Sequence, residues 1–289
     1  MTVKIKDMWH KAFISGDWYV GYRAISKNAE AFEIIENRKN TWIADPFVFE
    51  YKGEHYLFVE MIENKKGVIA YYKFIDDKPV YQEIVLRENY HLSYPCIFEY
   101  QGEVYMIPES ADNHSIDLYK AVEFPNRWQK VAKLAEGIFL DSTVFCYDEK
   151  YYLLTYEYNN GKYELSMWNL DIDAGVVQKK DMVEYRSNIA RPAGSVVEED
   201  GILYRPAQNC SRMYGEEIIW YKIDGLKQGR YKEEKDHCTR ANDLCGEFQR
   251  THTYNRDSKY EVVDFFKEKF SLTRPAKLIL KKAKQKIGQ

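Results

Sequence analysis

Apolar and polar residues alternate along most of the chain, and the pattern repeats about every 49 residues. In the first copy, residues 44–60, an apolar run leads to a turn at Gly53 and a second apolar run follows. The second copy, residues 93–109, has Gly102 at the same point, 49 residues after Gly53. Glycine readily adopts the positive φ that a tight hairpin turn needs, so each copy predicts a β-hairpin.

Weaker strand patterns lie between these copies, for example at Gly67–Phe74 and Ile84–Arg87, so each period holds about four strands. Later copies begin at Asp141 and Arg191, and a degraded fifth copy lies near residues 251–264. Four-stranded units that repeat at roughly 40–50 residues are typical of β-propeller blades. A twisted β-sandwich is the alternative.

We therefore predict an all-β fold, a five-bladed β-propeller that covers residues 1–266. The strand-like segment at residues 17–25 precedes the first copy. We expect it to pair with the last blade and close the ring, because closure removes exposed sheet edges.

Composition agrees with one large domain of this kind. The chain has 289 residues, of which 45% are hydrophobic and 16% aromatic, enough for a core. No apolar run approaches the roughly 18 residues that span a bilayer, and no signal-peptide pattern opens the chain. Five cysteines without a tight framework favour a reducing compartment, so we predict a cytoplasmic protein.

Charge is distributed unevenly along the chain. Residues 267–289 hold eight Lys or Arg and one Glu, a net charge of +7, whereas the whole chain has −3. Apolar residues after Pro275 fall on one helical face, which predicts a short basic C-terminal helix. Residues 275–289 are therefore expected to touch the inner face of a membrane, with a frayed tail as the alternative. The body carries −10, so nucleic acid is not an expected partner.

In a propeller, the residues that open the inner strands converge at one mouth of the central channel. Here they are Asp45, Tyr94, Asp141, Arg191 and His252. The ends of the repeat copies add a second ring, Glu60, Glu109, Arg205 and Gln208. Clustered carboxylates raise one another's pKa values and suit acid–base chemistry. The arginines suit phosphate or carboxylate binding, or serve as counter-ions to the acids.

Asp45 and Asp141 are the strongest catalytic candidates because both occupy the same repeat position. The alternative is a purely structural role, since aspartate often begins a turn. Two motifs suggest metals but are weak. Asp171-Ile172-Asp173 is short and falls in an outer turn, and the spacings among His237, Cys238, Cys245 and His252 do not match standard zinc sites. We predict no metal site and no required cofactor, and leave a divalent-metal requirement open.

Several motifs carry a family resemblance over roughly residues 15–265. They are Ala44-Asp45-Pro46, Ser93-Tyr94-Pro95, Pro108-Glu109-Ser110, Ala190-Arg191-Pro192-Ala193-Gly194, Arg205-Pro206-Ala207-Gln208 and His252-Thr253-Tyr254-Asn255. Together they resemble the N-terminal propeller domain of plant glucosamine inositolphosphorylceramide transferases and its bacterial relatives. The resemblance implies a part in surface-polysaccharide assembly. The opening at Asp45, and the second aspartate at Asp141, also resemble five-bladed glycosidases of families 43, 32 and 68.

One departure from the hydrolase pattern changes the expected reaction. Arg191 stands where a family 43 hydrolase has its glutamic general acid, and an arginine suits a leaving group that needs charge neutralisation, such as phosphate or diphosphate. We predict a glycosyltransferase that moves a sugar, for example a furanose such as phosphoribosyl, from a phosphate-activated donor to a glycan or lipid-linked acceptor.

In this prediction Asp45 is the general base or the nucleophile, and Asp141 and Glu109 stabilise positive charge on the sugar. Arg191 and Arg205 bind the phosphates, and the remaining mouth residues, Glu60, Tyr94, Gln208 and His252, bind substrate. A furanoside hydrolase and a non-catalytic carbohydrate-binding propeller are the alternatives.

Overall fold

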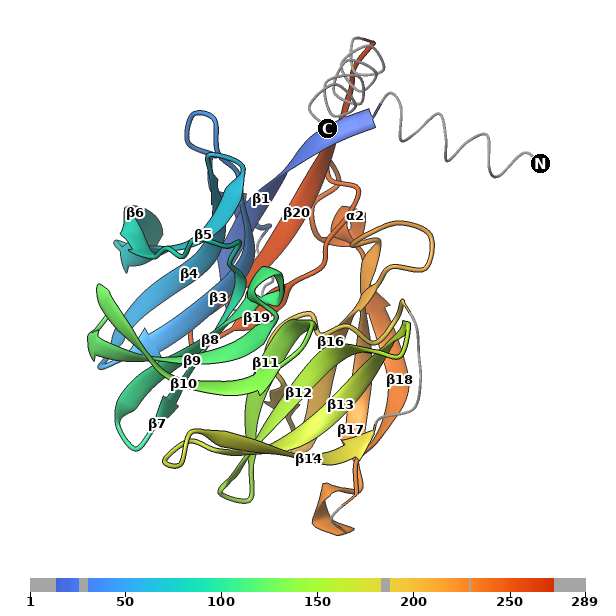
Figure 1. Ribbon diagram of the computed structural model, residues 1–289. Coiled ribbons are helices and arrows are strands. Elements are labelled where there is room, and N and C mark those ends of the chain that lie inside the picture. The colour runs from blue at the N-terminus through green and yellow to red at the C-terminus, as the bar shows by residue number, and fades with distance from the viewer. Residues whose placement is uncertain (1–13, 26–30, 183–187, 229, 273–289) are drawn as a thin grey trace, which may run out of the picture.

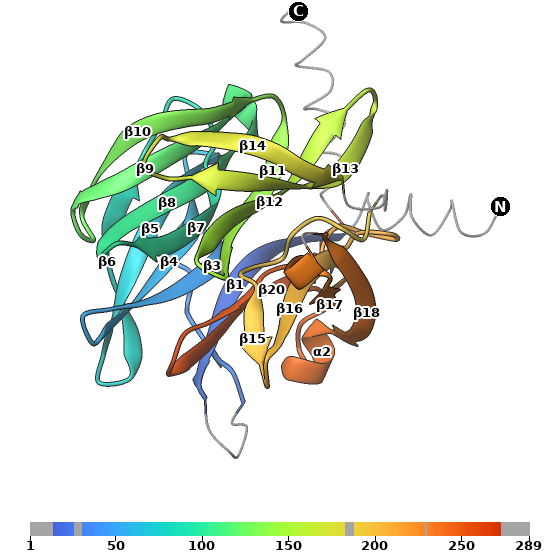
Figure 2. The same ribbon diagram turned by 90° about the horizontal axis from the view of Figure 1, so that it is seen from below.

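The computed structural model describes residues 14–25, 31–182, 188–228 and 230–272. Five four-stranded antiparallel sheets surround a common axis, which confirms the predicted five-bladed propeller (Figures 1 and 2). Among these residues, no helix is long and apolar enough to cross a membrane. The predicted boundary at residue 266 falls inside the last strand, and the predicted helix at 275–289 lies outside the described residues.

The first four blades follow one another along the chain, each with its inner strand first. Blade one is β3 (Ile43–Tyr51), β4 (Glu54–Glu63), β5 (Lys66–Ile75) and β6 (Lys78–Leu86). Blade two is β7 (Ser93–Tyr100), β8 (Glu103–Ser110), β9 (Ser115–Glu123) and β10 (Arg127–Glu136). Blade three is β11 (Phe139–Tyr147), β12 (Lys150–Asn159), β13 (Lys162–Asp171) and β14 (Val176–Met182). Blade four is β15 (Val197–Glu199), β16 (Ile202–Asn209), β17 (Glu217–Asp224) and β18 (Lys232–Thr239).

The fifth blade joins the two ends of the chain, as predicted. It consists of β19 (Tyr254–Arg256), β20 (Tyr260–Phe270), β1 (Ile14–Ala24) and β2 (Glu33–Ile34). β1 pairs with β20 along its whole length, from Ile14 opposite Phe270 to Ala24 opposite Tyr260. Figure 1 shows this pair rising beyond the other blades. The pairing removes the free edge that each strand would otherwise present.

Short helical turns complete the described elements: η1 (Ala111–Asn113), η2 (Leu226–Gln228) and α2 (Ala241–Leu244). The hairpin turns form as the repeat predicts. Lys52 and Gly53 have φ values of 52° and 77°, and Gln101 and Gly102 have 52° and 78°. Two consecutive positive φ values match the right-handed twist of the flanking strands.

Apolar side chains fill the spaces between neighbouring blades. The largest cluster joins blades one to three and includes Phe47, Phe58, Met106 and Leu153, all nearly without exposed surface. Aromatic contacts cross from blade to blade, such as Phe47 against Tyr94 with ring centroids 4.8 Å apart. The packed blades hold the channel-lining residues in place.

Candidate active site

Asp45, Tyr94 and Asp141 share one unusual backbone geometry at the start of the inner strands. Their φ values are 49°, 44° and 48°, in the left-handed region that non-glycine residues rarely adopt. At each of them the strand pairing shifts register. Such bulges redirect side chains, and backbone strain of this kind concentrates at functional sites. The repeat position chosen from the sequence is therefore also a repeated structural feature.

Asp45 lies in a buried network at the hub and has 4% of its surface exposed. Its Oδ1 accepts a hydrogen bond from the Thr253 hydroxyl at 2.7 Å, and its Oδ2 accepts one from the Tyr94 backbone N–H at 3.2 Å. Burial raises the pKa of Asp45 to about 7, although nearby His252 opposes the rise. A carboxyl with this pKa can accept and release a proton near neutral pH.

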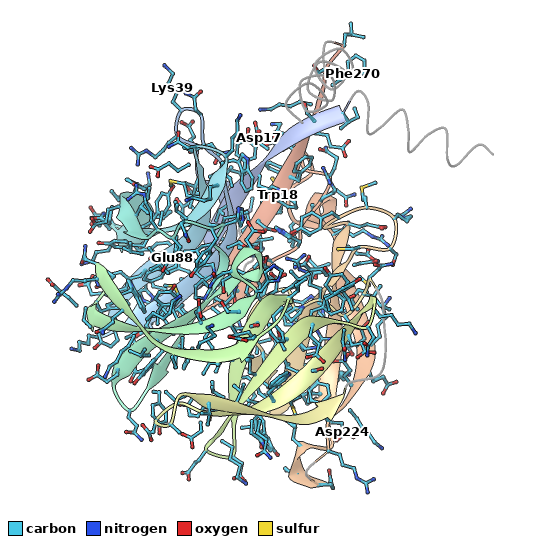
Figure 3. The ribbon with its side chains drawn as sticks, in the orientation of Figure 1. Asp17, Trp18, Lys39, Glu88, Asp224 and Phe270 are labelled. Carbon is cyan, nitrogen blue, oxygen red and sulfur yellow. The ribbon has the colours of Figure 1, made fainter. Side chains whose placement is uncertain are left out.

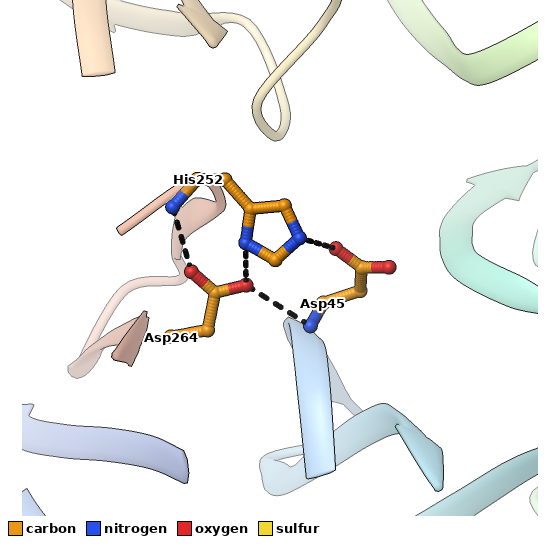
Figure 4. Close-up of side chains that lie close together, drawn as sticks. All are labelled: Asp45, His252 and Asp264. Atoms are coloured by element: carbon orange, nitrogen blue, oxygen red, sulfur yellow. Dashed lines mark hydrogen bonds and ion pairs between the residues drawn. The ribbon is translucent and has the colours of Figure 1, made fainter. Parts of the chain in front are cut away.

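Asp264 organises the groups behind Asp45 (Figure 4). One of its oxygens accepts the backbone N–H groups of His252 and Thr253, at 2.8 and 3.0 Å. The other lies 2.5 Å from His252 Nδ1 and accepts the Asp45 backbone N–H at 3.3 Å. Trp18 of β1, labelled in Figure 3, stacks on the His252 ring at 4.1 Å.

His252 therefore faces Asp45 from inside the protein. Its Nε2 lies 3.4 Å from Asp45 Oδ1, and only 2% of the residue is exposed. Burial by itself lowers the pKa of His252, but the carboxylates of Asp264 and Asp45 outweigh burial and raise it to about 8. The prediction that His252 binds substrate does not fit this burial, because its contacts position Asp45 instead.

Asp45, His252 and Asp264 also form a candidate metal-ligand group, with one ligand atom of each within 4.8 Å of the others. However, both Asp264 oxygens accept backbone N–H groups, and His252 Nδ1 is paired with Asp264. An ion would have to compete with these contacts, so we assign the group to positioning rather than to metal binding.

A second network joins blades two, three and four through Arg191. Its Nε donates to Asp141 Oδ2 at 2.5 Å, and its Nη2 donates to Asp141 Oδ1 and to Glu109 Oε2, both at 3.0 Å. Gln208 Nε2 donates to Asp141 Oδ2 at 2.5 Å and to the Pro192 carbonyl at 2.9 Å. These contacts support the counter-ion interpretation of Arg191.

Burial raises the pKa of Glu109 well above its ordinary value, and the Arg191 guanidinium only partly offsets that rise. Glu109 also accepts the Asp141 backbone N–H at 3.2 Å. The site thus combines Asp141, which Arg191 contacts through two nitrogens, with Glu109, whose pKa burial raises. Among the residues that the structure describes, no hydrogen bond reaches Arg191 Nη1, and the guanidinium carbon lies 5.7 Å from the centre of the Tyr214 ring.

Tyr94 contacts Asp45 through its backbone N–H and is fully buried. Its hydroxyl accepts the Gly194 N–H at 2.7 Å and lies 2.7 Å from the Thr143 hydroxyl. Gly194 has a φ of 130°, and a Cβ there would lie 1.8 Å from the Tyr254 carbonyl oxygen. The prediction that Tyr94 binds substrate is therefore corrected: it is a scaffold residue whose hydroxyl is already engaged.

Glu60 is the fourth of the predicted mouth acids and lies between blades one and two. Its Oε1 lies 3.0 Å from His91 Nε2, while the Gly67 backbone N–H donates to His91 Nδ1 at 3.0 Å. This second bond places the proton of a neutral His91 on Nε2, where it is donated to Glu60. His91 keeps 34% of its side chain exposed, so this pair reaches the surface.

The prediction that Arg205 lines the mouth is wrong. Arg205 is fully buried and pairs with Glu233, at 2.7 Å from Nε and 2.8 Å from Nη2. Its Nη1 donates to the Ala190 carbonyl at 3.0 Å. Arg205 and Gln208 are three residues apart on β16, and side chains alternate along a strand, so the two face opposite ways.

Sequence reasoning missed four residues of the site: Trp18, His91, Tyr214 and Asp264. For Asp264 a signal exists, because it is the one polar residue in the run Val262-Val263-Asp264-Phe265-Phe266. A buried acid in an apolar strand needs partners, which makes it a candidate for a structured site. For Tyr214, in the loop between β16 and β17, no local signal exists.

Comparison with known proteins agrees with this architecture. Residues 15–258 match the family model described as glucosamine inositolphosphorylceramide transferase 1, N-terminal. The rice (Oryza sativa subsp. indica) protein of that name is 31% identical over an alignment of 207 residues, and the match covers 67% of this chain and 28% of the relative. The Arabidopsis thaliana protein is 32% identical over an alignment of 206 residues, and the match covers 67% of this chain and 27% of the relative. The chain thus spans little more than a quarter of the length of these relatives.

Solved structures share the fold at low sequence identity. RS223 β-xylosidase superposes with a TM-score of 0.59 at 11% identity, covering 80% of this chain and 92% of that one. A thermostable family 43 glycoside hydrolase gives 0.58 at 14% identity, covering 80% and 90%. These likenesses show the propeller fold alone. With its family model matched over residues 15–258, the chain belongs to the family of the N-terminal domain of glucosamine inositolphosphorylceramide transferase 1.

Proposed function

We propose that the hub of this propeller catalyses glycosyl transfer. The observation that carries the proposal is the pairing of two acids with different surroundings at one hub. Asp45 has a pKa of about 7, and Asp141 is held by Arg191. Relatives named as transferases support glycosyl transfer in general, although this chain matches only part of their length.

Asp45 is the proposed general base. It accepts the proton of an acceptor hydroxyl as that oxygen bonds to the anomeric carbon of the donor sugar. The bond from that carbon to the donor phosphate breaks, and its electron pair leaves with the phosphate. A pKa near neutrality suits proton acceptance better than covalent attack, because a nucleophile must stay ionised.

The side of the hub next to Arg191 is the proposed leaving-group side. The Asp141 carboxylate stabilises positive charge that develops on the sugar ring, and the two N–H groups of Arg191 Nη1 are free to contact a phosphate oxygen. The donor is thus a sugar activated by phosphate or diphosphate. An activated furanose, such as phosphoribosyl diphosphate, is one candidate donor.

The acceptor is proposed to be a glycan or lipid-linked glycan of bacterial surface-polysaccharide assembly, at the cytoplasmic face of the membrane. The basic residues 275–289 support this placement through their sequence alone. Co-sedimentation with anionic vesicles tests it. The full chain should bind in low salt and a chain ending at Leu272 should not, whereas equal binding would contradict the role of the tail.

Glycoside hydrolysis is a second candidate, and one observation favours it. Burial raises the pKa of Glu109, and a raised pKa is what the general acid of a hydrolase requires. In that case Asp45 activates water, and the products are free sugars. Release of sugar from aryl glycosides in the absence of any acceptor separates this reaction from transfer.

Incubation of the purified chain with activated donors and glycan acceptors tests the proposed transfer. Nucleotide sugars, lipid phosphate sugars and phosphoribosyl diphosphate are supplied in turn, and release of the phosphate-bearing group is measured. Asp45→Asn should lower the rate at least about a hundredfold, the usual contribution of a general base.

Asp148→Asn is the matched control, since Asp148 is exposed in a hairpin turn of blade three and should leave the rate unchanged. Failure of every donor, or full activity of Asp45→Asn, would overturn the proposal. Glycan binding without turnover would assign the chain to the carbohydrate-binding class.

A further inference from the structure

A pocket of about 240 Å³ lies between blades three and four and has Arg191 in its wall. Its other lining residues are Leu140, Tyr156, Tyr163, Asn188, Cys210 and Tyr214. Three tyrosines and one leucine make the wall largely aromatic and apolar. The hub reactions described above do not use this space.

The aromatic wall has one fixed side. Tyr163 stacks on Tyr156 with ring centroids 5.1 Å apart and planes at 13°. Tyr156 is 5% exposed, and its hydroxyl accepts the Asn188 backbone N–H at 3.2 Å. Tyr163 is therefore supported from behind, as an aromatic platform for a ligand must be.

Tyr214 forms another part of the wall. Its ring packs edge-on against Trp18 at 6.1 Å and against His252 at 5.0 Å, and it is 43% exposed. The neighbouring Gly215 has a φ of 66°, and a Cβ there would lie 2.9 Å from the Trp18 ring. Glycine at this point lets the loop bring Tyr214 down to the hub.

Arg191 belongs to both the hub and the pocket. Its Nε and Nη2 contact Asp141 and Glu109, and the described residues provide no partner for Nη1. Protonation of Glu109, whose pKa burial raises, reduces the negative charge around Arg191. A phosphate at Nη1 then meets a charged hydrogen-bond donor, and a protonated Glu109 would repel it less than an ionised one.

We propose that this pocket binds the nucleoside of a nucleoside diphosphate sugar, whose diphosphate lies at Arg191. The inference rests on the proposed glycosyl transfer, in which the phosphate departs on the Arg191 side. The group attached to that phosphate must then occupy the adjoining space. In the reaction, the sugar–phosphate bond breaks, the nucleoside diphosphate leaves with the electron pair, and the acceptor's proton passes to Asp45.

The pocket discriminates among phosphate donors by size and character. It is smaller than the roughly 300–1,000 Å³ of sites for drug-sized ligands, which suits one base with part of its ribose. A bare diphosphate has no apolar surface to place against Tyr163 and Tyr214. Any of the nucleobases can stack on an aromatic side chain, so the supported ring of Tyr163 suits a nucleobase. Phosphoribosyl diphosphate is therefore disfavoured as the donor.

Isothermal titration of the full chain with UDP, GDP, ADP and CDP tests the inference, with inorganic diphosphate and phosphoribosyl diphosphate as comparison ligands. At least one nucleoside diphosphate should bind at least tenfold more tightly than inorganic diphosphate. Tyr214→Ala should weaken nucleotide binding by about tenfold, the loss expected for one stacked base. Tyr163→Phe should keep nucleotide binding, and Tyr163→Ala should lose it.

Tyr100→Ala is the matched control, because Tyr100 ends β7 at the opposite end of the channel. This variant should bind nucleotide as the unsubstituted chain does. Circular dichroism of each variant establishes that it has folded. Tyr214 is a loop residue outside the strands, so its substitution keeps the test usable even if Tyr163→Ala does not fold.

Alkylation gives a second measurement inside the same sample. Cys210 lines the pocket, whereas Cys146 is exposed elsewhere, so nucleotide should slow the labelling of Cys210 and leave that of Cys146 unchanged. Equal affinity for inorganic diphosphate, or no binding by any of the four nucleotides, would overturn the inference. If phosphoribosyl diphosphate were the sole donor turned over, the nucleoside site would be wrong but the proposed glycosyl transfer would stand.

Discussion

At the scale of single residues, the hub is built from acids whose protonation depends on their partners. Asp45 and Asp141 occupy equivalent positions, yet Asp45 contacts Thr253 and lies near His252, and Asp141 faces Arg191. The same backbone geometry therefore presents two carboxyl groups with different tasks. Such separation of paired carboxyl groups by environment is how one site carries out both acid and base chemistry.

The pair of Asp264 and His252 gives a pH dependence of stability that can be measured. The pKa of His252 rises from 6.5 to about 8 in the folded protein. The folded state thus holds the proton more tightly, and the resulting stability is present below pH 6.5 and is lost as pH rises through 8. A shift of this size corresponds to about 2 kcal/mol. The pKa of Asp45 rises from 3.8 to about 7, so its contribution also makes the folded state less stable as pH rises, but at lower pH than His252 does.

Asp264→Asn should lower the free energy of unfolding at pH 6 and flatten its decline toward pH 9, because the charged partner of His252 is gone. Denaturant titrations at a series of pH values measure this. NMR titration should show the His252 pKa falling in the variant. An unchanged His252 pKa would show that Asp264 does not act on it.

At the scale of elements, glycines at positive φ have two separate tasks. Gly53, at a hairpin turn, has a φ of 77°, and a Cβ added there would have no neighbouring atom within 4 Å. Gly194 has a φ of 130°, and any Cβ there would meet the Tyr254 backbone. The first glycine permits a turn, and the second permits two segments of neighbouring blades to approach each other.

Substitution of alanine for Gly53 and for Gly194 should therefore lower the free energy of unfolding by different amounts. Gly53→Ala should cost about 1 kcal/mol of unfolding free energy, because only the backbone conformation is disfavoured. Gly194→Ala should cost several times more, because the Tyr254 carbonyl must also move. Thermal denaturation of both variants under one condition makes the comparison. Equal losses would show that the close approach at Gly194 is easily relaxed.

At the scale of the whole molecule, the ring depends on one pairing between the two ends of the described chain. β1 and β20 form eleven residue pairs, from Ile14 with Phe270 to Ala24 with Tyr260. Trp18 of β1 stacks on His252, so the pairing that closes the ring also completes the hub. Closing the propeller and forming the site are thus coupled.

A chain that begins at residue 25 should lose its monomeric fold, because β20 would present a long unpaired edge. Size-exclusion chromatography and circular dichroism should show aggregation or unfolding. A synthetic peptide of residues 14–24, added in trans, should restore the folded monomer. A stable monomer without the peptide would contradict the closing role of β1.

The sequence by itself determined the blade count, the hairpin turns and the positions of Asp45 and Asp141, because strand alternation and turn chemistry are local and the repeat multiplies their signal. The placement of Arg205 was also open to local reasoning, since an odd separation from Gln208 puts the two on opposite faces of one strand. Other features needed the fold: the contact between Asp45 and Asp264 spans 219 residues, and the placement of Tyr214 against Trp18 depends on how the last blade closes. Local patterns specify which strands form, but only packing decides which distant groups share a buried, low-dielectric space and therefore change one another's pKa values.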